Sequence, residues 1–230
     1  MRIEGNDHLV EFNDVHSAVT ESDDQGAMDM FRNATYRGGI FRYNRFRDVG
    51  KTGDEPAVHG QAAIRFDDAI SGMLVYGNLF IRSANGNFGA VQMNSGRDNI
   101  FVDNARGVSG GWNPNNHVWR MLREDPEQSG FITNELYLER YPKIATMLDE
   151  PAVNHVWRNL FIRCDQITSG NIANLDLFQN AEFDTDPGFI DPEDYRPAAD
   201  SSVFEQIGLR RPPLEQVGLY EHPLRASPIK

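Results

Sequence analysis

Apolar and polar residues alternate along several short segments of the chain, and each segment contains an asparagine. The segments are HLVEFNDVHS (8–17), GIFRYNRFRDV (39–49), GMLVYGNLFIRS (72–83), DNIFVDNARGV (98–108) and HVWRNLFIRC (155–164). Alternation with a period of two residues predicts strands with one buried face. The asparagines that anchor the repeat are Asn13, Asn44, Asn78, Asn104 and Asn159.

A second alternating pattern falls between these segments, in GAMDMF (26–31), AAIRFDD (62–68) and AVQMNSG (90–96). Short strands that recur every ~25–35 residues, with Asn and Gly at the corners, are typical of a parallel β-solenoid. We expect the asparagines to adopt the left-handed backbone of the corners and to bond from coil to coil. The irregular coil length favours an all-β, right-handed parallel β-helix of about five coils.

Two regions depart from this pattern. Residues 113–152 contain helical spacing, with Asn134 as an N-cap and an apolar stripe that includes Leu136 and Ile144, so we expect a helical insertion. Residues 184–230 are rich in Pro, Asp and Arg and predict an irregular wrap that covers the last coil. Residues 1–230 then form a single domain. Because the first residues have the pattern of the middle of a repeat, we expect the chain to be the C-terminal part of a longer solenoid.

Composition narrows the functional class. The chain has 230 residues, 40% of them hydrophobic, with a formal net charge of −12. This acidic balance argues against nucleic acid as a partner, because phosphate binding needs a basic face. The single cysteine, Cys164, excludes an internal disulfide and a multi-cysteine zinc site. No apolar run approaches the ~20 residues of a membrane span, and the N-terminus has no signal-peptide pattern.

The residues that carry a family resemblance run in order along the chain. They are GNDHLVEFNDVHS, SDDQGAMDMF, IRFDDAISGMLVYGNLF, AVQMNSGRDNIFVDN, ERYPKI, DPGFID and VGLYEHPLRASP. Together they resemble right-handed parallel β-helix carbohydrate-active proteins of the pectate-lyase-like type, and most of all β-helical glycoside hydrolases acting on fucosyl or xylosyl linkages. The resemblance implies a polysaccharide or oligosaccharide substrate and an extracellular or periplasmic location. Met28-Asp29 and Arg65-Phe66 depart from the family pattern, so substrate preference is expected to differ.

Strand alternation places side chains on one outer face. In the second pattern, we expect the Met, Ile, Phe and Val residues to point inward. Their neighbours in the strand then point outward. Successive coils lie ~4.8 Å apart, so outward residues align in columns. The predicted columns are Asp29, Arg65, Gln92 and Phe31, Asp67, Asn94, with Asp24 and Asp68 at adjacent corners.

Two acids on this face are the candidate catalytic pair. Glycoside hydrolysis needs one protonated and one ionised carboxyl group. The resemblance implies Asp24 and Asp67 at these positions, and crowding by Asp68 would raise a pKa as general-acid work requires. The residues leave open which aspartate is the acid and whether configuration is retained. A purely structural role, in which a corner aspartate caps a turn, is the competing interpretation.

Other residues could bind the substrate. We expect Arg65, Gln92, Asn94 and Arg97 to position sugar hydroxyls, together with Asp29 and Asp68 on the same face. His16 and His59 flank this face, and Trp112 could stack on a sugar ring. The structural alternatives are a salt bridge from Arg97 to Asp98, solvated histidines and a packed tryptophan. No organic cofactor is expected; calcium could bind among Asp23, Asp24, Asp67 and Asp68, although they lack an EF-hand ligand order.

The sequence also allows two rival functions and an end-to-end association of two chains. A polysaccharide lyase on the same fold would need a basic residue near the site, and only Lys51 is close in sequence. A non-catalytic carbohydrate-binding or structural β-helix would engage Asp24 and Asp67 with backbone donors. The open first coil exposes strand edges, which favours end-to-end association into a homodimer.

Overall fold

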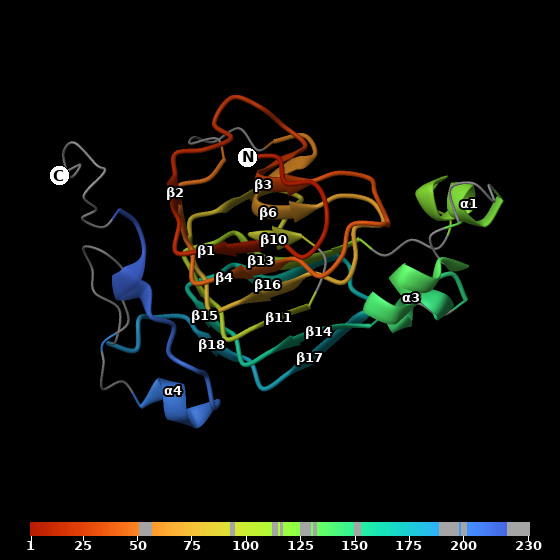
Figure 1. Ribbon diagram of the computed structural model, residues 1–230. Helices are drawn as coiled ribbons and strands as arrows, with labels where there is room; N and C mark the ends of the chain where they lie inside the picture. The colour runs from red at the N-terminus through yellow and green to blue at the C-terminus, as the bar shows by residue number, and fades with distance from the viewer. Residues whose placement is uncertain are drawn as a thin grey trace.

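Strands dominate the structure, which is a computed structural model (Figure 1). It describes residues 1–50, 57–92, 95–111, 115, 117–124, 130, 133–149, 153–188, 198 and 202–219. The strands form three parallel sheets, and the chain passes through the sheets in turn. This arrangement agrees with the predicted all-β parallel solenoid.

Within the described ranges, sheet B contains six strands. In spatial order they are β1 (Leu9–Glu11), β4 (Ile40–Arg42), β7 (Leu74–Tyr76), β11 (Ser95–Arg97), β14 (Asn154–Trp157) and β17 (Leu175–Phe178). In the same part of the chain, sheet C also contains six strands. They are β2 (Asp14–His16), β5 (Arg45–Arg47), β8 (Leu79–Ile81), β12 (Ile100–Val102), β15 (Leu160–Ile162) and β18 (Ala181–Phe183). The prediction of about five coils therefore missed one coil.

Sheet A carries the candidate site. Its parallel strands are β3 (Gln25–Met30), β6 (Gly60–Phe66), β10 (Val91–Gln92), β13 (Arg106–Gly111) and β16 (Gln166–Asn171). A short strand, β9 (Ala84–Gly86), pairs with the start of β6 in the antiparallel sense. The predicted inward residues Met28, Met30, Ile64, Phe66 and Val91 all belong to the core.

A ladder of asparagines joins the coils at the corner between sheets B and C. Along it, from the second member onward, each Asn Oδ1 accepts from both the backbone N–H and the side-chain amide of the asparagine one coil before. Its members are Asn13, Asn44, Asn78, Asn99, Asn159 and Asn180. The predicted coil-to-coil bonding is therefore confirmed, and the fourth member is Asn99, not Asn104.

The ladder asparagines do not adopt the left-handed backbone themselves. The residue before each one does: Phe12, Tyr43, Gly77, Asp98, Arg158 and Gln179 all have φ between +50° and +65°. The prediction assigned this conformation to the wrong residue, because the asparagine must keep its side chain turned inward to reach the next coil.

Asn104 belongs to a second row, at the far end of sheet C. Its Oδ1 accepts from the Ser83 backbone N–H at 2.7 Å, and its amide donates to the carbonyls of Phe80 and Val102. Cys164 occupies the same place one coil later, where its thiol contacts the carbonyls of Phe101 and Ile162. Burial raises the pKa of this thiol to about 11, so Cys164 is a packed structural residue.

A stack of phenylalanines fills the interior beneath sheet C. Their ring centroids lie 5.2, 4.9 and 4.7 Å apart with nearly parallel planes, in the order Phe46, Phe80, Phe101, Phe161. Identical residues align because the register repeats from coil to coil. Offset stacking adds about 0.5–1.5 kcal/mol per pair to the free energy of burial.

Helices occur in the region where the insertion was expected. They are α1 (His117–Glu124), α3 (Glu135–Arg140) and the 3₁₀ helix η1 (Pro142–Thr146). Asn134 caps α3 by accepting from the N–H groups of Leu136 and Tyr137, as predicted. Ile144 is buried, but Leu136 is 75% exposed, so the predicted apolar stripe is only partly correct. The stripe fails because α3 ends at Arg140 and the 3₁₀ turn changes the spacing.

The insertion packs against earlier coils. Trp119 and Leu122 of α1 form a cluster with Ala34 and Ala69. Near α3, the Tyr141 hydroxyl donates to the Asp7 carboxylate at 2.8 Å. In Figure 1 these helices lie on the opposite side of the strands from the C-terminal segment.

The described part of the C-terminal segment covers the outer face of sheet C. Helix α4 (Val203–Gln206) and the 3₁₀ helix η2 (Leu214–Gln216) pack on outward side chains of β8, β12 and β15. The Gly218 N–H donates to the carbonyl of Phe12 in the first coil. The wrap therefore runs along a sheet face, whereas the sequence predicted a cover over the last coil. Among the described residues, no helix is long and apolar enough to cross a membrane.

Candidate functional site

Arg65 is the centre of the candidate site. It lies on β6, every residue of which is buried, and Arg65 itself is only 4% exposed. Its Nη2 lies 2.7 Å from Asp24 Oδ1 and 2.9 Å from Asp67 Oδ1, and its Nη1 lies 3.5 Å from Asp29 Oδ1. One guanidinium therefore holds three of the predicted site aspartates together.

The parallel register explains why these residues meet. Asp29 on β3 is directly opposite Arg65 on β6, as the predicted column requires. Asp67 follows β6 by one residue, and its backbone N–H donates to the carbonyl of Met30. Asp24 precedes β3 and has a φ of +54°, so a left-handed corner turns it toward Arg65.

Asp67 is the buried acid of the pair. Its side chain is 10% exposed, whereas that of Asp24 is 52% exposed. Burial raises the pKa of Asp67; Arg65 opposes this shift, while Asp68 and Asp24 add to it. The sequence predicted the effect of Asp68, but the larger cause is burial. Burial also raises the pKa of Asp29, again opposed by Arg65.

Asp23 has the structural role that was the alternative for Asp24. Its carboxylate accepts the backbone N–H groups of Val58, His59, Gly60 and Asp24. These donors stabilise the ionised form, so they lower the pKa of Asp23 to about 2 even though burial acts in the other direction. Asp23 thus fixes the corner that presents Asp24, and the exposed His59 contributes its backbone to that corner.

Two residues of the site were missed by the sequence. Arg32 Nε lies 3.0 Å from Asp68 Oδ2 and 3.8 Å from Asp67 Oδ2. The ring centroid of Phe88 lies 5.4 Å from the guanidinium carbon of Arg65. Both residues follow a strand by one or two positions and occupy loops, where period-2 alternation gives no information about direction.

The remaining predicted site residues lie in different places. Gln92 on β10 is in register with Arg65, so it extends the same column. His16 is exposed on sheet C, and its described side-chain contact is with Ser17. Asn94 and Trp112 lie outside the described residues, as does Lys51.

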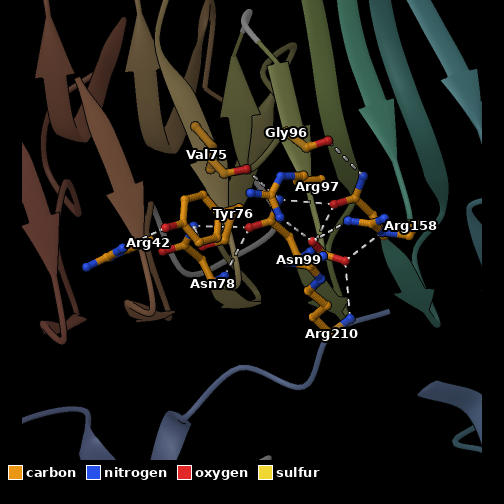
Figure 2. A network of polar contacts seen from close by, with 11 residues as sticks. Arg42, Val75, Tyr76, Asn78, Gly96, Arg97, Asn99, Arg158 and Arg210 are labelled. Atoms are coloured by element: carbon orange, nitrogen blue, oxygen red, sulfur yellow. Dashed lines mark hydrogen bonds and ion pairs between the residues drawn. The ribbon is translucent and has the colours of Figure 1, made fainter. Parts of the chain in front are cut away.

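Arg97 lies on sheet B and not on sheet A. It forms an ion pair with the buried Asp98 at 2.7 Å, which was the structural alternative for this residue. Asp98 also binds Arg158 and the Arg210 backbone N–H, so it ties the C-terminal segment to the solenoid (Figure 2). The guanidinium of Arg97 also lies 4.5 Å from the ring centroid of Tyr76.

Within the described ranges, no group of three or more His, Cys, Asp or Glu side chains has the geometry to hold a metal ion. The aspartates around Arg65 bind the guanidinium.

Comparisons with known proteins give no match among protein families, curated proteins or solved structures. The fold and the carboxylates around Arg65 are therefore the basis for the proposed function.

Proposed function

We propose that this protein is a glycoside hydrolase on a right-handed parallel β-helix, acting outside the cytoplasm on a polysaccharide or oligosaccharide. The observation that carries the proposal is the meeting of Asp24 and Asp67 at one nitrogen of Arg65. The pair combines an exposed carboxylate with a buried carboxyl group of raised pKa. Two carboxyl groups in different environments are what acid-assisted glycoside cleavage requires.

The two distances to Arg65 limit the separation of the pair. Arg65 Nη2 lies 2.7 Å from Asp24 Oδ1 and 2.9 Å from Asp67 Oδ1. The distance between the two Oδ1 atoms therefore cannot exceed the sum of these two distances. For these two oxygens, the limit is closer to the ~5–5.5 Å between the carboxyl groups of retaining enzymes than to the ~6.5–9.5 Å of inverting enzymes, which leave room for a water. The geometry therefore supports cleavage with retention of configuration.

The different environments of the two carboxyl groups support separate roles. Asp67, whose pKa is raised, donates its proton to the leaving oxygen as the glycosidic C–O bond breaks. Asp24 attacks the anomeric carbon, and the ionised carboxylate becomes a glycosyl ester. Asp67 then removes a proton from a water that displaces Asp24 and regenerates both groups. Arg65 holds the two carboxyl groups in place, with its charge offset by Asp29.

Separate Asp24→Asn and Asp67→Asn variants test the proposal in the full chain. On a glycan that the wild type cleaves, each should lose at least about 10²-fold in kcat/KM, the usual minimum contribution of acid–base catalysis. Asp48→Asn is the matched control, because Asp48 forms a similar ion pair with Arg82 outside the site. Full activity of both site variants would exclude the proposed pair, and products that absorb through a new C=C bond would indicate a lyase.

A further inference from the structure

Ser95, His155 and Asp176 lie side by side in one row of sheet B. They belong to three successive strands, β11, β14 and β17, which are neighbours in Figure 1. Gly96 is in register with Val156, so Ser95 lies opposite His155, and His155 is paired with Asp176. Val156 belongs to the core, so His155 points outward, as do its neighbours in the row. A serine, a histidine and an aspartate that are 60 and 21 residues apart in the chain thus share one outer face.

The contacts within this row link the acid to the histidine and the histidine to the serine. His155 Nδ1 lies 3.0 Å from Asp176 Oδ2, which orients the imidazole and leaves Nε2 as the nitrogen that can accept a proton. Ser95 Oγ accepts the backbone N–H of His155 at 3.1 Å, which places the hydroxyl between β11 and β14. Among the described residues, no hydrogen bond joins Ser95 Oγ to the imidazole. That bond has to form when a substrate binds, as it does in many enzymes whose free form has loose catalytic contacts.

A cation and two aromatic rings form a second row beside the first. Arg97, Trp157 and Phe178 lie two residues farther along the same strands and are also in register. The rings of Trp157 and Phe178 stack with their centroids 5.7 Å apart, and the guanidinium carbon of Arg97 lies 5.9 Å from the Trp157 centroid. The centroid of the His155 ring lies 6.3 Å from each aromatic centroid, so the two rows form one surface. Phe178 is 40% exposed, so a flat apolar group can pack on this surface.

We propose that Ser95, His155 and Asp176 form a second active site, which hydrolyses carboxylic esters. The inference is independent of the proposed glycoside hydrolase function. Ser95 Oγ attacks the ester carbonyl while Nε2 of His155 takes the hydroxyl proton. The proton then passes to the leaving oxygen as the C–O bond breaks, which leaves an acyl-serine and an alcohol. Water hydrolyses the acyl-serine by the same route, releases the acid and restores the hydroxyl.

The surroundings of Ser95 define the class of substrate. The groups that can stabilise an oxyanion are the backbone N–H of His155, which already contacts Oγ, and the guanidinium of Arg97. Arg97 donates from Nη1 to Asp98, and its other N–H groups form no hydrogen bond within the described part of the chain. The side chains of His155 and Asp176 are half exposed. An open site stabilises charge less than a dry one, so it suits esters, which are more reactive than amides.

Covalent labelling tests the nucleophile without a known substrate. The full chain is treated with phenylmethylsulfonyl fluoride, from which an activated serine Oγ displaces fluoride to form a sulfonyl ester. Peptide mass spectrometry should find the label on Ser95, and His155→Gln should slow the labelling at least about 10²-fold, the usual contribution of a general base.

Ser17 is the matched control for labelling. Its hydroxyl also lies beside a histidine, 3.4 Å from His16 Nδ1, but the residue in register with His16 is Arg47 and not an acid. Ser17 should therefore stay unlabelled. No label on Ser95, equal labelling of Ser17, or labelling that His155→Gln leaves unchanged would overturn the proposal.

Ester hydrolysis tests the complete reaction. The probe is p-nitrophenyl acetate, an activated ester whose planar ring can pack beside Trp157. The wild-type chain should release p-nitrophenolate faster than buffer does, and Ser95→Ala should lose at least about 10²-fold of this rate. Asp176→Asn should lower the rate at least about tenfold, because the imidazole loses the acceptor that orients it. Ser17→Ala should leave the rate unchanged.

Ser95→Ala also separates the proposed site from simple histidine chemistry. A surface imidazole can hydrolyse an activated ester by itself, and this variant keeps both His155 and Asp176. Water can replace Ser95 Oγ at the exposed N–H of His155, so the variant should keep the wild-type melting temperature. Asp176→Asn changes an exposed side chain and is a second test at the surface. A rate that Ser95→Ala leaves intact, or no rate above that of buffer, would overturn the proposal.

Discussion

Two aspartates at corners of the solenoid have pKa values shifted in opposite directions. Asp67 is buried beside two other acids, and its pKa is raised, mainly by burial. Asp23 receives four backbone N–H groups, and its pKa falls to about 2. Residue type alone cannot separate these outcomes, because both residues belong to Asp-Asp pairs in the sequence. What differs is whether the carboxyl oxygens face N–H donors or a desolvated cluster.

The pH dependence of activity follows from the environment of Asp67. If Asp67 is the acid, the rate falls as pH rises through its pKa. Asp68→Asn removes a charge that helps to raise this pKa, and it frees Arg32, which lies 3.0 Å from Asp68 and 3.8 Å from Asp67. Both changes should move the alkaline limb of the kcat/KM profile to lower pH. An unchanged or upward-shifted limb would contradict the assignment of Asp67 as the acid.

The pH dependence of stability follows from Asp23. Its pKa is lowered from 3.8 to about 2 in the folded chain, so its stabilisation is complete above pH 3.8 and is lost as pH falls through about 2. In Asp23→Asn, an amide NH₂ faces the backbone donors that one carboxylate oxygen accepted. Thermal melts should show a deficit for this variant near neutral pH that shrinks as pH falls. A deficit independent of pH would mean that the charge of Asp23 contributes nothing.

At the scale of elements, the asparagine ladder connects every coil in sheets B and C. Asn78 is fully buried, and its Oδ1 accepts from the backbone N–H and the amide of Asn44, while its own amide reaches Asn99. Because both neighbours depend on one side chain, an interior member supports two coil junctions.

Asn78→Ala should therefore destabilise the fold more than Asn180→Ala. Each buried group left without a partner costs about 1–3 kcal/mol, so we expect Asn78→Ala to lower the free energy of unfolding by about 2 kcal/mol or more. Asn180 ends the ladder and is only partly buried, so water can replace some of its bonds. Urea unfolding of both variants measures the difference, and equal losses would contradict a cooperative ladder.

At the scale of elements, the sequence predicts the strands but not all of their connections. Period-2 alternation identified the strands of sheet A and the inward direction of Met28 and Ile64, because one face of each strand must be buried. It did not locate Asn99 in the ladder, because Asn104 is also followed by an alternating segment. The C-terminal segment was predicted as a wrap, but its position along sheet C depends on contacts such as that of Arg210 with Asp98, which local pattern does not encode.

For the whole molecule, the repeat determined the fold class and brought distant acids together. Asp24, Asp29 and Asp67 were expected on one face because parallel coils align equivalent positions. Their convergence on a single guanidinium was not predictable, because it depends on the left-handed corner at Asp24 and on the rotamer of Arg65. The contact of the Phe88 ring with the Arg65 guanidinium was also missed, since Phe88 belongs to a loop.

The anomeric configuration of the first product tests the central claim most directly. Proton NMR during cleavage, before the new reducing end equilibrates, should show the same configuration as the bond that was broken. This result is expected because one oxygen of Asp24 and one of Asp67 both contact Arg65 Nη2, which favours the short carboxyl separation of retaining enzymes. A first product of inverted configuration, or an unsaturated product, would contradict the account.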